Sequence, residues 1–351
     1  MIPNRLGRVS AGRFPIGLIV FWPLLATPAQ EVEVSRVPYG GWNNNLRLSN
    51  GTVELIMTLD VGPRIIRYGF IGKKNAFKEY ADQMGKAGES EWMIRGGHRL
   101  WTAPEDTTRT YALDNSPIQH EITDKRTVRL LPAEDKPYGV RKEIEVALAP
   151  RGTRVTVTHR IRNTAQEPTR LAPWAITVMA PGGIEIIPLP DKRPHPGSPK
   201  NAKSPADFAP NQALALWSYF DFRDPRYTFG SRYILLKQDA TRGPTKIGLA
   251  LRLGWAAYWN DGLLFVKRFN YSEGRIYPDF GVNYETFTNE DMLEMETLGP
   301  LTNVKPGGVV QHVERWELFA GVPPPSDEAA IDRHIRPLAE VKPAPKKSPS
   351  P

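Results

Sequence analysis

The sequence predicts an all-β protein, a sandwich or barrel of many strands with few short helices. Short segments rich in β-branched and aromatic residues alternate polar and apolar side chains along most of the chain. Glycine, proline, asparagine and aspartate separate these segments, as expected for turns. No long amphipathic helical pattern alternates with the strands, which disfavours a parallel α/β sheet.

Each expected strand follows from the same period of two, with turn residues at its ends. Residues 154–161 (RVTVTHRI) show the alternation clearly. Helical patterns are limited to residues 77–84 and 329–338. The expected strands, in chain order, are residues 52–59, 64–68, 127–131, 141–147, 154–161, 246–253, 263–269, 282–288, 292–298 and 309–319.

Composition excludes several classes of function. The 351-residue chain contains no cysteine, which excludes disulfides, thiolate nucleophiles, zinc–thiolate sites and iron–sulfur clusters. Its net charge of +8 is scattered, with acidic residues interleaved throughout. Nucleic-acid binding depends on a clustered basic face. The sequence contains no such cluster, so we expect no nucleic-acid partner.

Residues 1–29 have the three parts of a secretory signal. Basic residues precede an apolar run, and Thr27 and Ala29 supply small side chains at the −3 and −1 positions of a cleavage site. The run is shorter than the roughly 20 residues that span a bilayer. We therefore expect a periplasmic or secreted protein without an integral membrane span after cleavage. An uncleaved anchor is the alternative, which Pro23 and Pro28 disfavour.

The rest of the chain divides into a domain and a tail. Residues 31–322 carry the strand pattern without an internal repeat, and we expect them to form one β-sandwich domain. Residues 188–210 are a proline-rich excursion within it. Residues 323–351 are rich in proline and lysine, and we expect a largely disordered C-terminal tail with one short amphipathic stretch.

Several segments together resemble the galactose mutarotase-like superfamily. They are residues 61–67 (VGPRIIR), 96–105 (GGHRLWTAPE), 171–183 (LAPWAITVMAPGG), 283–289 (NYETFTN) and 292–300 (MLEMETLGP). As a set they resemble a bacterial family of that superfamily known as domain of unknown function 4380. The resemblance implies a large two-sheet antiparallel β-sandwich, the galactose mutarotase-like supersandwich, with the ligand on its concave face.

Characterised members of this superfamily include aldose 1-epimerases, in which a carboxylate base acts at the anomeric hydroxyl and a histidine acid at the ring oxygen. This sequence departs from that pattern, because Trp174 occupies the region where the acid histidine is expected. An indole cannot donate and recover a proton near neutral pH. The resemblance therefore leaves both an epimerase-like enzyme and a binding module without the acid open.

The candidate catalytic residues are His98, Glu296 and Glu294. His98 follows two glycines that permit close approach of a ligand, and an imidazole titrates in the working pH range. Glu294 and Glu296 alternate with apolar residues, so their carboxylates share one strand face about 7 Å apart. They could divide acid and base roles, with Glu296 as the base, or bind Ca²⁺. A solvated strand face is the alternative. No other cofactor or metal is expected.

The candidate substrate-binding residues combine aromatic and charged side chains. Aromatic rings stack on the apolar faces of a sugar, while charged groups bond its hydroxyls. The set is Arg64, Arg99, Trp101, Glu105, Trp174 and Glu285. Further aromatic candidates, each of a type more often found in a core, are Trp42, Trp217, Tyr219, Trp255, Tyr258 and Trp259.

The sequence thus predicts an exported carbohydrate-handling protein whose ligand is a mono- or oligosaccharide. One hypothesis is aldose-epimerase-like acid–base chemistry in a sugar-binding cleft. The alternative is a non-catalytic carbohydrate-binding module of the cell envelope, and a purely structural envelope protein ranks behind both. The first hypothesis requires His98 and Glu296 to meet across one cleft beside an aromatic wall.

Overall fold

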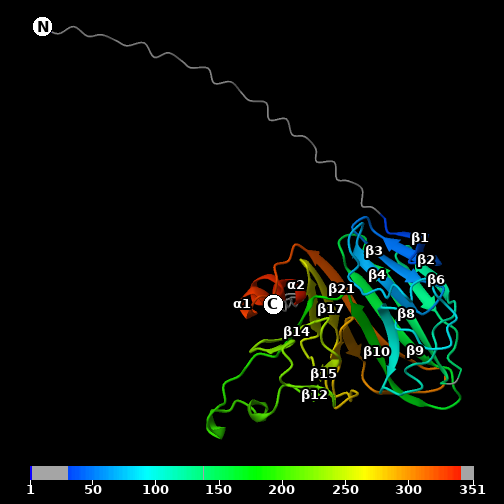
Figure 1. The fold of residues 1–351 in the computed structure, drawn as a ribbon. Coiled ribbons are helices and arrows are strands. Elements are labelled where there is room, and N and C mark those ends of the chain that lie inside the picture. The colour runs from blue at the N-terminus through cyan, green and yellow to red at the C-terminus, as the bar shows by residue number, and fades with distance from the viewer. Residues whose placement is uncertain (2–30, 137, 341–351) are drawn as a thin grey trace.

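Two antiparallel β-sheets packed face to face make up most of the molecule (Figure 1). The computed structural model describes Met1 and residues 31–136 and 138–340. Apart from Met1, the expected signal over residues 1–29 lies outside the described residues, as do residues 341–351 of the expected tail. The all-β prediction is confirmed, and so is the two-sheet antiparallel sandwich that the family resemblance implies.

The first sheet has eleven strands, and its centre brings together distant parts of the chain. A short strand, β20 (Thr302–Val304), pairs with the beginning of β10. The other strands, in spatial order, are β1 (Glu33–Tyr39), β2 (Trp42–Ser49), β3 (Val53–Thr58), β4 (Arg64–Phe70), β5 (Gly97–Ala103), β10 (Thr169–Met179), β19 (Leu293–Leu298), β18 (Tyr284–Thr288), β15 (Thr245–Leu249) and β12 (Leu214–Leu216).

The second sheet has ten strands and is also antiparallel. Its middle is formed by long strands from the first half and the end of the described chain. In spatial order the strands are β13 (Tyr227–Phe229), β14 (Tyr233–Lys237), β11 (Ile184–Pro188), β16 (Trp255–Asn260), β17 (Leu263–Phe269), β21 (Val309–Ala320), β9 (Val155–Asn163), β8 (Val140–Leu148), β7 (Thr127–Leu131) and β6 (Gln119–Asp124).

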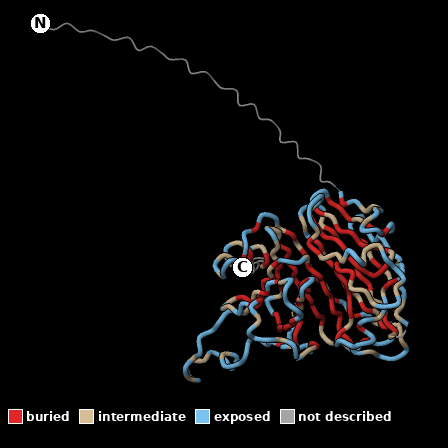
Figure 2. The backbone as a smooth tube through the Cα atoms, viewed as in Figure 1, coloured by how far each residue is buried: buried red, intermediate tan, exposed pale blue. Residues whose placement is uncertain are grey.

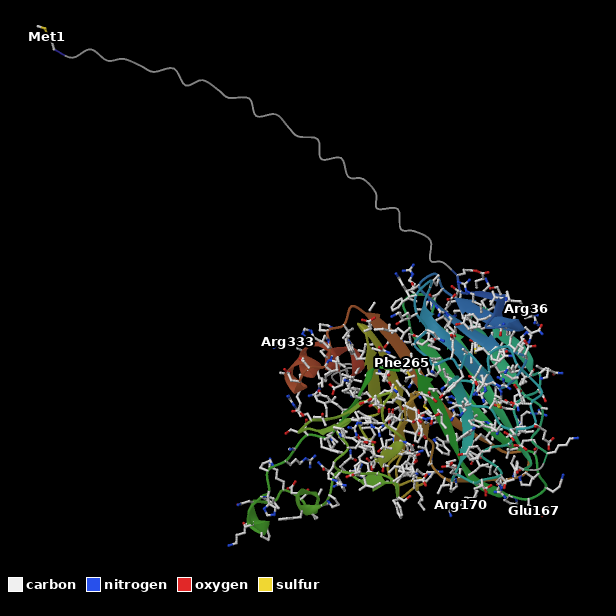
Figure 3. All side chains as sticks on the ribbon, viewed as in Figure 1. Met1, Arg36, Glu167, Arg170, Phe265 and Arg333 are labelled. Carbon is white, nitrogen blue, oxygen red and sulfur yellow. The ribbon has the colours of Figure 1, made fainter. Side chains whose placement is uncertain are left out.

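The apolar faces of the strands fill the space between the sheets. Leu55, Val157 and Phe265 are almost fully buried there. Figure 2 shows that the buried backbone follows the two sheets, and Figure 3 labels Phe265 within the sandwich. This core follows from the period of two, because alternate side chains of a strand point to the same face. Burying one such large side chain contributes about 1.5–3 kcal/mol.

Residues 77–84, expected to be helical, are extended over 77–80 and form turns over 81–84 instead. Phe77 is buried between the sheets and pairs with Met179 in an isolated β-bridge. Asn75 supports this extended path, because its side-chain oxygen accepts hydrogen bonds from the backbone N–H groups of Tyr68 and Phe77. Burial of one aromatic ring between the sheets therefore outweighs the helical pattern of the segment.

The prediction of a largely disordered tail over residues 323–351 is wrong for residues 323–340. Two short helices, α1 (Glu328–His334) and α2 (Arg336–Ala339), pack on the second sheet. Ile331 and Ile335 are fully buried against apolar residues of β16 and β17. The gain from burying these side chains offsets the entropy of ordering the segment. Two short 3-10 helices, η1 (Pro199–Asn201) and η2 (Pro205–Phe208), lie in the proline-rich excursion.

Within the described residues, none of the helices has the length and apolar character needed to cross a membrane.

The register of β5, β10, β19 and β18 decides which side chains meet. Arg99 lies opposite Ile176, Ile176 opposite Glu296, and Glu296 opposite Glu285. Directly opposed residues of antiparallel strands point to the same face of the sheet. Arg99, Glu296 and Glu285 therefore share one face, and His98, the neighbour of Arg99, points to the other.

Candidate functional site

His98 lies on the inner face of the first sheet and points at the second sheet. Its Nδ1 lies 2.8 Å from Oγ1 of Thr177, and its Nε2 lies 2.7 Å from Nε2 of His159 on β9. Its side chain has no exposed surface. The prediction that His98 and Glu296 meet in one cleft is therefore wrong, because successive residues of a strand alternate faces and Arg99 holds the position in register with Glu296.

We name the buried polar residues around His98 the inner cluster. Glu314 on β21 organises it: Oε1 lies 3.0 Å from Nζ of Lys267, and Oε2 accepts a 2.8 Å hydrogen bond from Nε1 of Trp316. The hydroxyl of Thr297 also donates to Glu314. The inner cluster comprises His98, His159, Thr177, Lys267, Thr297, His312, Glu314 and Trp316.

The hydrogen bonds assign a tautomer to each of these histidines. Nδ1 of His159 lies 3.1 Å from the carbonyl oxygen of His312 and must carry a proton. Nε2 of His159 then accepts from Nε2–H of His98, and Nδ1 of His98 accepts from the Thr177 hydroxyl. Thr297 gives its proton to Glu314, so Nε2 of His312 donates to Thr297. All three imidazoles are satisfied in their neutral forms.

Burial sets the charges of the inner cluster. It lowers the pKa of His98 well below the usual range, that of His159 to about 4 and that of His312 to about 3. Burial alone would raise the pKa of Glu314, but the Lys267 ammonium reverses this and lowers it. The inner cluster therefore consists of one ion pair and three neutral histidines.

The inner cluster also contains a set of atoms with the spacing of a metal site. Donor atoms of His98, His159 and Glu314 all lie within 4.8 Å of one another. However, the buried ammonium of Lys267 beside Glu314 would face any divalent cation bound there. The proton between His98 and His159 already uses the facing lone pair of His159. Charge and hydrogen bonding thus fit a closed structural network better than a metal centre.

The opposite face of the same sheet carries the outer cluster. It brings together most of the predicted site residues, which come from four neighbouring strands, and a fifth strand adds Lys246. All of its members are buried. The outer cluster comprises Arg99 and Trp101 of β5, Trp174 of β10, Lys246 of β15, Glu285 of β18, and Glu294 and Glu296 of β19.

Two carboxyl groups of the outer cluster share one ammonium. Nζ of Lys246 lies 2.8 Å from Oε2 of Glu285 and 2.9 Å from Oε2 of Glu296. Nε1 of Trp174 donates to the same oxygen of Glu296 at 2.8 Å. The ammonium also lies 4.7 Å from the ring centroids of Trp174 and Trp217, at cation–π distance. The Ca²⁺ alternative would require a divalent cation to displace this ammonium.

The environment separates the protonation states of these two carboxyl groups. Burial raises the pKa of Glu285 well above its usual range, and the nearby Glu296 carboxylate raises it further. Burial also raises the pKa of Glu296, but Lys246 and Trp174 both donate to it and stabilise its charged form. Burial alone would lower the pKa of Lys246, and the two carboxylates raise it instead. We therefore assign the proton to Glu285, with Glu296 and Lys246 charged.

Arg99 lies between a carboxylate and two indoles. Its Nη2 donates a 2.9 Å hydrogen bond to Oε1 of Glu294. Its guanidinium carbon lies 4.3 Å from the ring centroid of Trp101 and 5.3 Å from that of Trp92. This stacking orients the guanidinium group over the outer face of the sheet.

An aromatic wall borders the outer cluster on the side of β5. The ring centroid of Trp101 lies 5.3 Å from that of Trp174 and 5.1 Å from those of Trp92 and Tyr111. The hydroxyl of Tyr111 donates a 2.7 Å hydrogen bond to Glu105. Tyr111 and Glu105 are both exposed, so the structure places Glu105 at the rim of the site rather than inside it.

Several buried polar atoms at this face lack a hydrogen-bond partner among the described residues. They are Nε and Nη1 of Arg99, both Oε1 and Oε2 of Glu285, Oε1 of Glu296 and Nε1 of Trp92; Oε2 of Glu285 is in ion-pair contact with Lys246 but has no hydrogen bond. Leaving such a group unpaired costs about 1–3 kcal/mol, so native proteins rarely do so without a reason. The inner cluster has no atom of this kind in the part of the chain that the structure describes. The outer cluster therefore retains donors and acceptors that the hydroxyl groups of a ligand could satisfy.

Arg64 does not belong to this site, contrary to the sequence prediction. Its guanidinium donates to Asp114 at 2.9 Å and to the carbonyl oxygens of Met93 at 3.0 Å and Ile94 at 2.6 Å. Burial lowers its pKa to about 10. Arg64 therefore anchors the loop that precedes β5 and has no exposed surface for a ligand.

The further aromatic candidates are divided between the site and the cores. Trp217 lies over Lys246 at the outer cluster, where Gly248 leaves room for it: a Cβ there would lie 3.3 Å from Cζ3 of Trp217. The charges of Lys246 and Glu296 both influence the pKa of Tyr219, so Tyr219 lies near the outer cluster. Trp42, Trp255, Tyr258 and Trp259 pack in apolar clusters elsewhere.

Sequence patterns do not single out three of the residues at this site. A lysine inside a strand ordinarily lies on a solvated face, so Lys246 gives no signal of its own. Trp92 and Tyr111 lie in segments without a strand pattern, and they reach Trp101 only through the path of two loops.

Solved structures with the same fold include galactose mutarotase-like proteins. One from Lactobacillus casei has a TM-score of 0.51 and 10% identity, and the match covers 79% of this chain and 100% of that one. A protein from Synechocystis sp. has a TM-score of 0.52 and 11% identity, and the match covers 82% of this chain and 99% of that one. A galactose mutarotase related enzyme from Lactobacillus acidophilus has a TM-score of 0.50 and 7% identity, and the match covers 80% of this chain and 99% of that one. The chain therefore has the galactose mutarotase-like fold, and these identities show the fold alone.

Neither a family model nor a curated protein matches the sequence. The narrower resemblance to domain of unknown function 4380 stays a prediction.

Proposed function

We propose that this chain, which has the galactose mutarotase-like fold, is an exported carbohydrate-active protein. It binds a mono- or oligosaccharide at the outer cluster and interconverts the anomers of the reducing sugar, with Glu296 as the base. The observation that carries the proposal is the group of unpartnered polar atoms on Arg99, Glu285 and Glu296 beside the aromatic wall. The signal pattern of residues 1–29 supports export.

The composition of the outer cluster suits a pyranose ring. The indoles of Trp101 and Trp174 offer apolar surface for the C–H faces of a sugar. Arg99 supplies free N–H donors, and the two carboxyl groups supply free oxygens. Aromatic walls with a few placed polar groups are the general pattern of small-ligand sites.

The charges of the outer cluster favour an uncharged sugar. Arg99 already pairs with Glu294, and Lys246 already pairs with Glu285 and Glu296. Hydroxyl groups can both donate and accept, so they match the mixture of free donors and acceptors. An anionic sugar would bring a further negative charge next to Glu296 without a free cation to balance it.

A ligand must displace aromatic side chains to reach the buried atoms. Trp217 directly follows the three-residue edge strand β12 and lies over Lys246. Tyr111 lies on a loop and contacts Trp101. The charged groups lie on central strands of the sheet, whereas this cover lies on loops and an edge. We therefore expect the cover to move and the charged groups to stay in place.

Glu296 is placed for removal of a proton from an anomeric hydroxyl. Its Oε2 is held by Lys246 and Trp174, which fixes the orientation of the carboxylate. Its Oε1 is free, so one oxygen is available to a substrate. Positioned carboxylates of this kind accelerate proton transfer by about 10²–10⁴-fold.

A second candidate function is sugar binding without catalysis. It is favoured by one observation: no histidine contacts the outer cluster among the described residues, and His98 is sealed on the inner face. The epimerase-like combination of His98 with Glu296 is therefore not available. Under this candidate the outer cluster binds a sugar and leaves its anomeric ratio relaxing at the spontaneous rate.

The experiment combines calorimetry with NMR on the full chain. A panel of glucose, galactose, mannose, N-acetylglucosamine and their β-linked disaccharides is titrated, and anomer exchange is measured by magnetisation transfer. We expect at least one sugar to bind and Trp101→Phe to weaken its affinity about threefold or more. Trp259→Phe, a matched change on the second sheet, is expected to leave the affinity unchanged.

The outcomes separate the candidates. Faster exchange with the wild-type chain, lost in Glu296→Gln, supports the enzyme. Binding without faster exchange supports the binding module. Absence of binding across the panel contradicts both.

A further inference from the structure

Glu285 and Glu296 form a matched pair across two neighbouring strands. They lie directly opposite each other on β18 and β19, so their side chains run side by side on the outer face. One oxygen of each carboxyl group binds the same ammonium, at 2.8 Å for Glu285 and 2.9 Å for Glu296. The other oxygen of each, Oε1, has no partner among the described residues. Each carboxyl group of the pair therefore offers a free Oε1 on the outer face of the sheet.

We propose that Glu285 is the general acid that complements Glu296 in anomer exchange, and that Lys246 is the positioning residue that holds the two carboxyl groups together. This inference rests on the proposed function, because it requires an aldose at the outer cluster. It replaces the histidine of the epimerase pattern with a carboxylic acid on the adjacent strand.

The reaction balances without any further reactant. The Glu296 carboxylate takes the proton of the anomeric hydroxyl O1–H, and the C1–O5 bond breaks with its electron pair moving to O5. O5 takes the proton of Glu285, and C1=O1 becomes the aldehyde of the open chain. After rotation about C1–C2, O5 attacks the other face of C1 and returns its proton to the Glu285 carboxylate. O1 then takes back the proton held by Glu296, and both carboxyl groups regain their starting forms.

Geometry supports a pair of this kind. O1 and O5 are bonded to the same carbon, so the acid and the base must stand side by side on one face of the site. His98 cannot serve, because it lies on the other face of the sheet and has no exposed surface. Glu294 is less suited than Glu285, because Arg99 holds one of its oxygens by a direct hydrogen bond.

The surroundings place the proton on Glu285. The charged and titratable groups that face the pair are Lys246 on β15, Glu294 on β19, Asp279 in the loop before β18, and Tyr219. Burial raises the pKa of Glu285 well above its usual range, while Asp279 and Glu296 also disfavour a second negative charge. Lys246 and Trp174 stabilise the charge on Glu296 by direct hydrogen bonds. An acid and a base thus stand ready at neutral pH.

The test measures anomer exchange of D-glucose and D-galactose by magnetisation-transfer NMR, with affinities from calorimetry. Glu285→Gln keeps the size of the side chain and removes the transferable proton. We expect it to lower the enzyme-dependent exchange rate at pH 7 about 100-fold or more, with the affinity changed less than about threefold. Glu285→Asp, which keeps a carboxylic acid, is expected to retain part of the rate. The matched control is Glu145→Gln on β8, a strand carboxylate paired with Arg129 and Arg160, which is expected to keep the full rate.

Lys246 is tested by the pH profile. Lys246→Gln removes the cation that stabilises the charged form of Glu296, so the pKa of Glu296 rises and the acidic limb of the exchange profile moves to higher pH. A role confined to folding would reduce the amount of folded protein and leave the limb in place.

Each outcome decides the proposal. A Glu285→Gln variant with the wild-type exchange rate overturns the acid assignment and leaves the proposed function standing. A wild-type chain that binds sugar without faster exchange overturns the acid assignment and leaves the binding module. A chain that binds no sugar of the panel overturns the proposed function itself. If circular dichroism shows Glu285→Gln to be unfolded, the rate of Glu285→Asp decides. A rate below that of Glu145→Gln but above the spontaneous exchange supports the acid, and a rate equal to either of these two contradicts it.

Discussion

The first sheet carries a buried polar cluster on each face, and the two clusters differ in how their polar atoms are satisfied. In the inner cluster, Glu314 accepts from Lys267, Thr297 and Trp316, and the histidines complete the network among themselves. In the outer cluster, Arg99, Glu285 and Glu296 each keep at least one unpartnered atom. Both clusters are equally hidden from solvent, so burial does not distinguish them.

The two clusters therefore differ in the completeness of their hydrogen bonding, although unpartnered buried atoms also occur away from both clusters, for example on Arg64 and Glu185. A satisfied buried network stabilises one arrangement of two sheets. A buried polar group without a partner carries a cost that a bound hydroxyl group can remove. The hydrogen bonds of His98 fit a structural role, and the unpartnered atoms on the other face support the sugar site that we propose.

The largest expected difference between the clusters is in stability. Glu314→Gln leaves the buried Lys267 ammonium without its counter-ion and is expected to lower the free energy of unfolding by about 3–5 kcal/mol. In Glu296→Gln, Glu285 can lose its proton and become the counter-ion of Lys246, so this change is expected to cost only about 1 kcal/mol. Urea denaturation followed by tryptophan fluorescence measures both. Equal losses would break the distinction between the two clusters.

The next effect is the response of the inner cluster to acid. The pKa of His159 falls to about 4 in the folded chain from about 6.5 when unfolded. Its contribution to stability is therefore complete above pH 6.5 and declines as the pH falls towards 4, because the unfolded chain binds a proton that the folded chain excludes. We expect a loss of about 2 kcal/mol between pH 7 and pH 5 from this residue. His159→Gln should reduce that pH dependence in urea denaturation, and an unchanged dependence would show that His159 is not held neutral.

The outer cluster should respond in affinity rather than stability. Arg99→Lys retains a positive charge beside Glu294 but loses the free Nε–H and Nη1–H donors. We expect sugar affinity to fall about tenfold, or about 1.4 kcal/mol, with the urea midpoint unchanged. Arg129→Lys on β7, where the arginine pairs with Glu145, is the matched control and should leave affinity unchanged. Equal affinities for Arg99→Lys and the wild type would remove Arg99 from the site.

The smallest expected effect is that of a chelator on the inner cluster. Because a proton and the Lys267 ammonium already satisfy His98, His159 and Glu314, removal of divalent metals should leave the melting temperature unchanged. Thermal denaturation with and without EDTA, together with elemental analysis of the purified chain, measures this. A stoichiometric metal whose removal lowers the melting temperature would turn the structural network into a metal centre.

Much of the outer cluster could be predicted from local patterns. The alternation of Glu294 and Glu296 with apolar residues predicted a shared strand face, and the structure places them on one face. Trp101 and Trp174 were also expected at the site, and they lie opposite each other on β5 and β10. The alternation of polar and apolar residues along one strand, however, does not tell which face of the strand points away from the second sheet. His98 was therefore assigned to the same cleft as Glu296, although its strand turns it to the other side.

The sequence by itself predicts ten of the strands, their alternating faces and the separation of charged from apolar positions, because the period of two is a property of the local backbone. Only the tertiary structure decides that His98 meets His159, that Lys246 meets Glu285 and Glu296, and that residues 323–340 pack on the second sheet. These contacts join segments far apart in the chain. The register of the strands and their order in each sheet depend on the packing of the whole sandwich.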